Sequence, residues 1–363
     1  MPEPLPSLHI LGSRQFGGAD QFFVRLLRAL DEAGQPVTAV TRPASPVASA
    51  LGASGIGQIH LPLANGWDLW SLWGIRRLVG RLRPAVVQTY MGRATRLTRL
   101  PRRSPALHVA RLGGYYKIDG YYRHAHAWVG NTRGLCDYLV GQGLPAGRVF
   151  HIGNFVPDPL ELGAEQRAQL RGQWQLGDDA WVLLALGRLI DIKGFDDLLR
   201  ALALLPATVG DRPWTVLIAG DGPLAEPLRN LAQKLGLAER LRWLGWQDPP
   251  DRCYAVADAF LCPSRREALG NVILEAWNYR LPVIATRTPG ALELIEPEVS
   301  GLLCDIGDAA GLAARIRELL AAQAAHRNAL GAAGHRYLAS RCSRRAVVEA
   351  YLQLYAQLAA GGS

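Results

Sequence analysis

Residues 181–194 read WVLLALGRLIDIKG, an apolar run followed by a loop with a glycine at each end. The run WVLLAL (181–186) predicts a short buried strand, and the pattern that begins near Phe195 predicts a helix. Gly187 and Gly194 allow a sharp turn between the two. Short apolar strands that alternate with helices are typical of a parallel sheet covered on both faces, so this stretch indicates an α/β fold.

The same alternation extends in both directions along the chain. Prolines and polar residues around 155–165 predict a linker that separates two groups of elements. The strand candidates before it are LHIL (8–11), PVTAV (36–40), AVVQTY (85–90), LHVAR (107–111), AWVG (127–130) and RVFHIG (148–153), and those after it are WVLLAL, WTVLIAG (214–220), RLRWLGW (240–246), AFLCPS (259–264), PVIAT (282–286) and SGLLCD (300–305). Helical patterns cover 19–32, 67–82 and 131–141, another opens at Pro223, and the last twenty residues form one amphipathic helix.

We therefore predict two Rossmann-like, doubly wound domains with a cleft between them, which suits a chain of 363 residues. No window approaches 18 consecutive apolar residues, and the N-terminus (MPEPLPSLHI) lacks a basic segment followed by an apolar run, so we expect a cytoplasmic protein. The five cysteines lack CxxC spacing, which disfavours a disulfide framework or a thiolate metal site and fits inert packing residues.

Positive charge is concentrated in the first half of the chain. Residues 1–160 contain 18 Lys and Arg against 8 Asp and Glu, whereas residues 161–363 contain 22 against 23. Such a surface would attract an anionic membrane, a nucleic acid or a phosphorylated acceptor, and the alternative is a set of solvated arginines. Much of the excess lies in Arg76, Arg77, Arg81, Arg83, Arg93, Arg96, Arg99, Arg102 and Arg103.

The loop 187–194 carries two cations where open α/β sheets bind ligands, beyond the carboxyl end of a strand. Arg188 and Lys193 lie beside the start of a helix, whose backbone amides are free to donate. A guanidinium, a mobile ammonium and oriented amides together suit a diphosphate, although such residues are often ordinary surface charge.

A second stretch, PSRREALGNVILEAW (263–277), follows the strand AFLC and contains Glu267 and Glu275. Glu267 precedes the helix and can accept hydrogen bonds from sugar hydroxyls, whereas Glu275 lies about two turns further along and can bind a ribose diol. Gly270 and Asn271 lie at the helix start, where backbone amides can meet an oxyanion. A solvated acidic face is the alternative, but the surrounding residues are apolar.

Two more loops can line the site of a nucleotide base. AGDGP (219–223) contains Gly220, and LGWQDP (244–249) contains Trp246, which can stack on a base or serve packing alone. TRTPG (286–290) and Glu293 can close the floor of the site.

In the first half of the chain, Gly17 and Gly18 precede a helix and let the backbone approach a phosphate. This loop is no GxGxxG, and no acid follows at dinucleotide spacing, so a nicotinamide cofactor is not expected.

The motifs GRLIDIKG, AGDGP, EALGNVILE, PVIAT and TPGALELI, in this order, resemble family 4 of the retaining glycosyltransferases (group 1) with the GT-B fold. The resemblance covers about residues 181–310, and LGSRQFGGAD resembles the family's opening glycine loop. It implies an acceptor-binding domain over 1–156 and a donor-binding domain over 157–343. Within the family, the chain is similar to the bacterial glycosyltransferases of lipopolysaccharide and surface-polysaccharide synthesis. The C-terminal helix, 344–363, is expected to return to the first domain.

The resemblance also assigns roles to residues. Glu267 would face the donor sugar and Glu275 the ribose, while Arg188 and Lys193 would hold the diphosphate, and Gly17 and Gly18 would complete the phosphate pocket. The catalytic set is Arg188, Lys193 and Glu267, and the donor-binding set is Gly17, Gly18, Gly187, Arg188, Lys193, Gly220, Trp246, Glu267, Leu269, Gly270, Asn271, Val272 and Glu275.

One departure concerns the first domain. Many members carry a histidine followed by a glycine near the transferred sugar, whereas the corresponding stretch here reads VARLGGYYK (109–117), and His108 lies upstream on the strand. The neighbouring residues that can contact sugar or acceptor instead are Arg111, Gly113, Gly114 and Tyr115.

We expect a retaining transfer in which the leaving phosphate takes the acceptor proton. The chain contains no Asp-x-Asp, so no metal and no cofactor are expected. Arg188 and Lys193 would instead stabilise the negative charge of the diphosphate, as a metal ion does elsewhere. The expected partners are a nucleotide-sugar donor and a glycan or lipid-linked acceptor at the inner face of the membrane, and no nucleic acid. The alternatives are a nucleotide-sugar epimerase of the same fold, a non-enzymatic nucleic-acid- or anion-binding protein, and an inactive sugar-nucleotide sensor.

Overall fold

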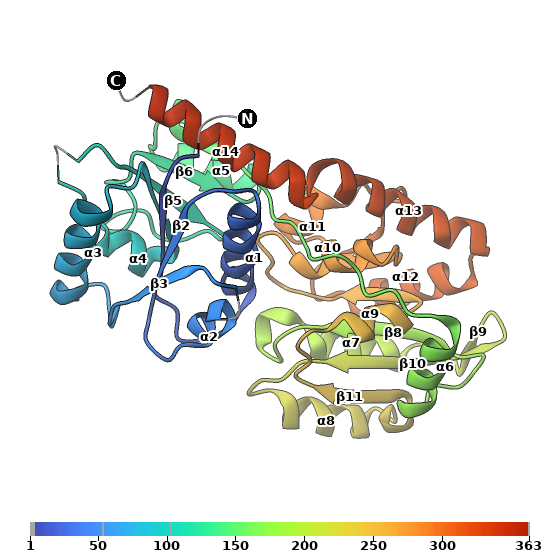
Figure 1. Ribbon diagram of the computed structural model, residues 1–363. Helices are drawn as coiled ribbons and strands as arrows, with labels where there is room; N and C mark the ends of the chain where they lie inside the picture. Colours follow the sequence, from blue (N-terminus) through green and yellow to red (C-terminus); the bar gives the residue numbers. More distant parts are fainter. Residues whose placement is uncertain (1–3, 53, 102–103, 362–363) are drawn as a thin grey trace. The chain divides into compact units, whose positions relative to one another are not determined.

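The computed structural model describes residues 4–52, 54–101 and 104–361, which form two compact units (Figure 1). Unit 1 comprises Met1–Pro157 together with Arg341–Ser363, and unit 2 comprises Asp158–Ser340. Arg102 and Arg103, two of the arginines singled out above, lie outside the described residues.

Unit 1 is built on a parallel sheet of seven strands in the order β3-β2-β1-β4-β5-β6-β7. Almost every residue of β1, β4, β5 and β6 is buried, because helices cover both faces of the sheet. The strands are β1 (Ser7–Leu11), β2 (Val37–Thr41), β3 (Gly57–His60), β4 (Val86–Tyr90), β5 (Leu107–Leu112), β6 (Ala127–Gly130) and β7 (Val149–His151).

The helices of unit 1 are α1 (Gly18–Glu32), α2 (Pro46–Gly52), α3 (Leu69–Leu82), α4 (Met91–Leu97), α5 (Arg133–Gly141) and α14 (Arg344–Ala360), with a 3-10 turn at Ala146–Arg148. Alternate residues of β1 serve two apolar cores. Leu11 packs in a core shared by α1 and α14, whereas Leu8 and Ile10 pack with residues of α3 and α4.

The last helix of the chain, α14, belongs to unit 1 (Figure 1). Tyr351 and Tyr355 are buried in the same core as Phe22 and Phe23 of α1. The Tyr355 hydroxyl donates to Gln88 Oε1 of β4 at 2.7 Å, so the buried hydroxyl has a partner.

Unit 2 repeats the same architecture, with the parallel strand order β11-β10-β8-β12-β13-β14 and a short β9 antiparallel to β10. The strands are β8 (Trp181–Leu186), β9 (Thr208–Val209), β10 (Arg212–Ala219), β11 (Leu241–Gly245), β12 (Ala259–Cys262), β13 (Val283–Thr286) and β14 (Leu302–Cys304). The helices are α6 (Ala164–Gln173), α7 (Phe195–Ala203), α8 (Ala225–Lys234), α9 (Asp251–Val256), α10 (Asn271–Asn278), α11 (Pro289–Leu294), α12 (Ala309–Ala321) and α13 (Ala324–Arg341), with 3-10 turns at Asp191–Lys193 and Ala238–Arg240.

From β1 the sheet of unit 1 extends through β2 to β3 on one side and through β4 to β7 on the other. From β8 the sheet of unit 2 extends through β10 to β11 on one side and through β12 to β14 on the other. The predicted pair of doubly wound parallel-sheet domains is therefore confirmed. In such sheets the order reverses at a switch point, where the loops beyond two neighbouring strands diverge and leave room for a ligand. The switch point of unit 2 lies between β8 and β12.

Within residues 4–52, 54–101 and 104–361, none of the helices has both the length and the apolar character needed to cross a bilayer.

Candidate active site

The two loops that carry the predicted phosphate and sugar ligands meet at the switch point of unit 2. Residues 187–194 follow β8, and residues 263–270 follow β12, which pairs with β8 through Ala259 and Phe260. Backbone hydrogen bonds join the loops, since the Arg265 and Arg266 amides both donate to the Ile192 carbonyl oxygen, at 2.9 and 3.2 Å. Residues about 70 positions apart in sequence thus form one edge of the sheet.

Lys193 and Glu267 form an ion pair across this edge. Lys193 Nζ lies 2.5 Å from Glu267 Oε2, and the side chains are 19% and 17% exposed. Burial lowers the pKa of Lys193, the Glu267 carboxylate raises it, and the net shift is upward although the neighbouring Arg188 opposes it. Lys193 is therefore charged at neutral pH, and both Glu267 and Arg188 act on its charge.

Buried polar groups orient Glu267 further. The Ser264 hydroxyl donates to Glu267 Oε2 at 3.2 Å, and the Thr286 hydroxyl of β13 donates to the Ser264 carbonyl oxygen. Burial, and then the Glu267 charge, raise the pKa of the nearby Cys262 thiol to about 11, so it is a neutral thiol at pH 7. The expectation that Cys262 is an inert packing residue agrees with this environment.

Glycines allow the backbones of these loops to touch. A Cβ on Gly194, whose φ is +64°, would lie 2.1 Å from the Pro263 carbonyl oxygen. A Cβ on Gly290 would lie 2.6 Å from the Leu269 carbonyl group, and the Gly290 amide donates to the Glu267 carbonyl oxygen at 3.0 Å. Only glycine fits at these two positions without displacing backbone.

Arg265 connects the two loops through side chains, and sequence reasoning missed it. Its guanidinium donates to Asp197 Oδ2 at 2.9 Å, to Asp196 Oδ2 at 2.8 Å and to Asp191 Oδ1 at 2.6 Å. The bond to Asp197, with that to Asp196, raises the pKa of Arg265 above its usual range. The only signal in the sequence is a cation beside Glu267 and a cluster of acids near Lys193, which does not identify the partners.

The glycines of the loops after β8, β10 and β11 form a row along the sheet edge. The Gly187 amide donates to the Ala219 carbonyl oxygen at 3.0 Å, and the Gly220 amide donates to that of Gly245 at 2.7 Å. A Cβ on Gly220 would lie 1.9 Å from the Gly187 carbonyl oxygen. Trp246 follows this row and is exposed, so its indole is accessible to a flat ligand.

The start of α10 combines a glycine cap with two partly exposed residues. Gly270 caps the helix in the left-handed conformation, with φ +87°. The Leu269 side chain is buried, whereas Asn271 and Val272 are partly exposed. Leu269 can therefore meet a ligand only through its backbone.

Glu275 lies on α10 beyond this start. Its Oε2 accepts a hydrogen bond from the Tyr254 hydroxyl at 3.0 Å. Burial, and then the Glu275 charge, raise the pKa of Tyr254 well above its usual value, so the hydroxyl remains a donor. Tyr254 is a second polar neighbour of the predicted acids that the sequence did not reveal.

Gly17 and Gly18 belong to unit 1 and lie at the start of α1, beyond the carboxyl end of β1. The Gly17 amide donates to Asp20 Oδ2 at 2.9 Å, and Gly18 is exposed. Burial raises the pKa of Asp20 although the Gly17 bond opposes the shift. The loop thus has exposed backbone at a helix start, as a phosphate site requires.

The four predicted acceptor-side residues occupy different environments in unit 1. Arg111 is buried, with its Nε donating to the Tyr351 hydroxyl of α14 at 3.1 Å and its guanidinium 4.0 Å from the Phe22 ring centroid. This geometry gives Arg111 a structural task in joining α14 to β5. Gly114 is buried and Gly113 partly so, whereas Tyr115 is exposed.

The histidines of unit 1 differ in exposure: His9 and His108 are buried, His124 is partly exposed, and the other three are exposed. His108 is buried, and its Nε2 lies 2.9 Å from Thr89 Oγ1. Burial, and then His124 and His126, lower the pKa of His108 well below its usual value. His124 Nε2 lies 2.8 Å from the Thr95 carbonyl oxygen. Within the described ranges, no group of three or more His, Cys, Asp or Glu side chains is placed to hold a metal ion.

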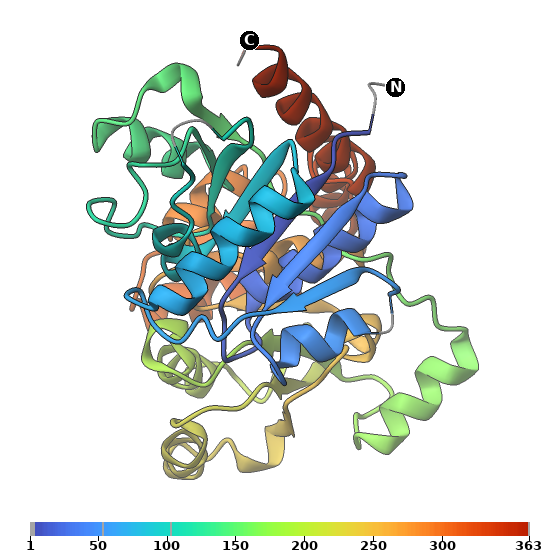
Figure 2. The same ribbon diagram turned by 60° about the vertical axis from the view of Figure 1, so that its left-hand side comes forward.

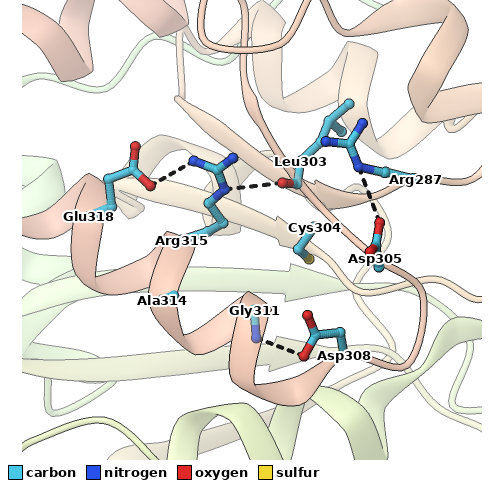
Figure 3. Close-up of a pocket in the computed structure, with 9 residues that line it drawn as sticks. All are labelled: Arg287, Leu303, Cys304, Asp305, Asp308, Gly311, Ala314, Arg315 and Glu318. Atoms are coloured by element: carbon cyan, nitrogen blue, oxygen red, sulfur yellow. Dashed lines mark hydrogen bonds and ion pairs between the residues drawn. The ribbon is translucent and has the colours of Figure 1, made fainter.

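A separate recess of about 320 Å³ lies beside β14 and α12 of unit 2 (Figure 3). Four of its charged residues form two ion pairs within it, since Arg315 contacts Glu318 at 2.8 Å and Arg287 contacts Asp305 at 3.3 Å. The lining residues are Arg287, Leu303, Cys304, Asp305, Asp308, Gly311, Ala314, Arg315 and Glu318, a set distinct from the predicted donor ligands.

The edge of unit 2 therefore offers a charged ammonium, a guanidinium and a helix start to an anion, with carboxylates beside them for hydroxyl groups. Residues 166–337 match the family described as glycosyl transferases group 1. The chain is 34% identical over 341 residues to the lipopolysaccharide core biosynthesis glycosyltransferase LpsE of Rhizobium meliloti (strain 1021). The aligned residues cover 94% of this chain and 96% of that protein.

Two solved structures have a similar fold. A glycosyltransferase from Rickettsia africae ESF-5 has a TM-score of 0.86 at 18% identity, covering 98% of each chain. Anabaena HepE in complex with UDP and glucose has a TM-score of 0.84 at 18% identity, covering 97% of this chain and 100% of that one. The chain therefore belongs to the group 1 glycosyltransferases, and its two parallel-sheet α/β domains have the GT-B fold.

Proposed function

We propose that this glycosyltransferase moves a sugar from a nucleotide-diphosphate sugar to a glycan or lipid-linked glycan, in the assembly of the lipopolysaccharide core. The observation that carries the proposal is the Lys193–Glu267 pair, 2.5 Å apart, at the switch point of unit 2 and beside the start of α10. Its position beyond the carboxyl ends of β8 and β12 is where parallel sheets bind nucleotides. The resemblance to LpsE supports the assignment to lipopolysaccharide.

In the proposed reaction, Lys193 and Arg188 neutralise the charge that develops on the diphosphate as the bond to the sugar weakens. The amides at the start of α10 add oriented donors. Glu267 accepts hydrogen bonds from the transferred sugar, and Glu275 accepts them from the ribose. Both carboxylates already have neighbouring donors, Ser264 and Tyr254, which fix their orientation.

We further propose that the anomeric configuration is retained and that no metal takes part. A phosphate oxygen of the leaving group takes the proton of the acceptor hydroxyl as the new glycosidic bond forms, so the chain need not supply a base. Lys193 stays protonated throughout, because its raised pKa keeps the charge that would otherwise come from a divalent cation.

The acceptor is proposed to bind unit 1 through the exposed Tyr115. With a lipid-linked acceptor, the transfer would take place at the cytoplasmic face of a membrane, with which the protein would be peripherally associated. The excess of Lys and Arg in residues 1–160 supports attraction to an anionic surface. HepE, which has a similar fold, binds UDP and glucose, and this supports a UDP-sugar as the first donor to test.

Thermal-shift measurements with UDP-, GDP- and ADP-sugars test donor binding directly, because a ligand that binds the folded state raises the melting temperature. One donor should stabilise the wild type, and Lys193→Gln should weaken its binding by about tenfold to a hundredfold through loss of a charge-assisted contact. Lys234→Gln, which removes an exposed lysine of α8, is the matched control and should bind normally.

Nucleotide release with an acceptor glycan then separates the alternatives. A glycosyltransferase releases nucleotide when the acceptor is added, whereas an epimerase converts the UDP-sugar without one, and an inactive sensor binds the donor without releasing nucleotide. The proposal fails if no nucleotide sugar stabilises the protein or if Lys193→Gln binds as the wild type does.

A further inference from the structure

Large apolar side chains are exposed where β3 leads into α3 of unit 1. Trp67, Leu69, Trp70 and Trp73 are 78%, 74%, 80% and 58% exposed. Tryptophan is seldom so exposed, because its ring has a large apolar area to remove from water. Figure 1 labels α3 at the left of the view, and Figure 2 brings that side forward. We call these four residues with the arginines of α3 the tryptophan–arginine surface.

Ordered structure holds these side chains outward. Asp68 caps α3 by accepting from the Ser71 amide at 3.0 Å, and its other oxygen accepts from the Ala64 amide at 2.9 Å. The opposite face of α3, with Ile75, Leu78 and Val79, is buried against the sheet. Rotation of the helix to bury the tryptophans would expose this core, so the surface needs a partner outside unit 1 or solvent.

The chemistry of the neighbouring residues identifies that partner. Arg76, Arg77, Arg81 and Arg83 are exposed along the C-terminal half of α3 and just beyond it. Arg96 lies with its guanidinium 3.7 Å from the Trp67 ring centroid. Asp68 is the only acidic residue between positions 33 and 118, and its carboxylate caps the helix. The surface therefore combines apolar rings with uncompensated positive charge.

We propose that the tryptophan–arginine surface docks on a bilayer that contains anionic lipids, with the indole rings at the headgroup level. Tryptophan suits the membrane interface because its ring is apolar and its N–H is polar. Arginines beside it attract anionic headgroups, each strengthening binding about fivefold. A protein partner or a second copy would more typically bring acids to such a face. The inference deepens the proposed function, since it rests on a lipid-linked acceptor and names the surface that reaches it.

Co-flotation of the full chain with phosphatidylcholine vesicles, with and without phosphatidylglycerol, tests the proposal. The wild type should float with the anionic vesicles only. Trp70→Gln/Trp73→Gln should weaken this binding by about tenfold or more. Val299→Gln, at an exposed apolar residue of unit 2, is the matched control and should bind as the wild type does.

Charge is tested in the same way. Arg76→Gln/Arg77→Gln/Arg81→Gln should weaken binding to anionic vesicles by on the order of a hundredfold. Arg252→Gln/Arg317→Gln/Arg336→Gln removes the same charge from exposed positions of the C-terminal half and should have little effect. Thermal unfolding of each variant verifies that it folds.

Equal binding of the tryptophan variant and the wild type, or equal binding of the wild type to neutral vesicles, would overturn the proposal. The proposal would also be overturned if the protein does not bind vesicles and instead self-associates, or binds a soluble glycan, through Trp70 and Trp73. Donor binding is measured in parallel. If the protein binds vesicles but no nucleotide sugar, the proposed reaction fails and the proposed docking surface is retained. If it binds a nucleotide sugar but no vesicles, the docking surface fails and the proposed reaction is retained.

Discussion

Replacing Gly194 with alanine tests whether the active-site loops depend on close backbone contact. A Cβ there would lie 2.1 Å from the Pro263 carbonyl oxygen, whereas real Cβ atoms essentially never approach within 3.0 Å. The loops would have to separate by about 1 Å in a close-packed interior. Overpacking costs about 1–3 kcal/mol, and an L-residue in the left-handed region costs about 1–2 kcal/mol more. We expect Gly194→Ala to lower the free energy of unfolding by about 2–5 kcal/mol.

Gly236→Ala is the matched control. Gly236 has φ +69° and no atom within 4 Å of the added Cβ, so it should lose only about 1–2 kcal/mol. Urea denaturation of both variants measures the difference. Because Lys193 adjoins Gly194, separation of the loops also moves Lys193 away from Glu267. We therefore expect nucleotide release to slow by about a hundredfold in Gly194→Ala and to be unchanged in Gly236→Ala.

Equal unfolding free energies for the two variants would refute the steric argument. If Gly194→Ala is destabilised but releases nucleotide at the wild-type rate, the contact with Pro263 stabilises unit 2 without positioning the catalytic residues.

Three further predictions concern the site, the metal and pH. In Arg265→Lys the single ammonium cannot contact all three aspartates at once, so donor affinity measured by titration should fall by about tenfold. Arg266→Lys, at the exposed neighbouring position, is the control and should bind the donor normally. Equal affinities of the two variants would contradict a positioning role for Arg265. EDTA should leave the rate of nucleotide release unchanged, and complete loss of activity would contradict metal-independent transfer. Burial lowers the pKa of His9 from 6.5 to about 3, so the unfolded chain binds a proton that the folded one does not, and stability should fall as pH drops from 6.5 toward 3. His9→Asn should reduce that slope by about 1.4 kcal/mol per pH unit in denaturation series, and an unchanged slope would exclude His9 as its source.

The fold could be read from the sequence because its signals are local. Buried parallel strands need consecutive apolar residues, and WVLLAL became β8 (Trp181–Leu186). The helix predicted over 67–82 begins at Leu69, where Asp68 caps it. β3 (Gly57–His60) was not predicted, since GQIH has one apolar residue and forms a half-exposed edge strand. The resemblance to group 1 glycosyltransferases is confirmed by the comparisons.

The sequence by itself determined two α/β domains and the loops in which cations, carboxylates and glycines follow the strands. Only the tertiary structure decided which of these residues meet. Lys193 contacts Glu267, and Arg265 contacts three aspartates, because β12 pairs with β8 although β10 and β11 come between them in the chain. It also buried Arg111 and left Trp70 in solvent, which residue type alone would not suggest. Strand order and burial depend on contacts between distant segments, and no local pattern encodes them.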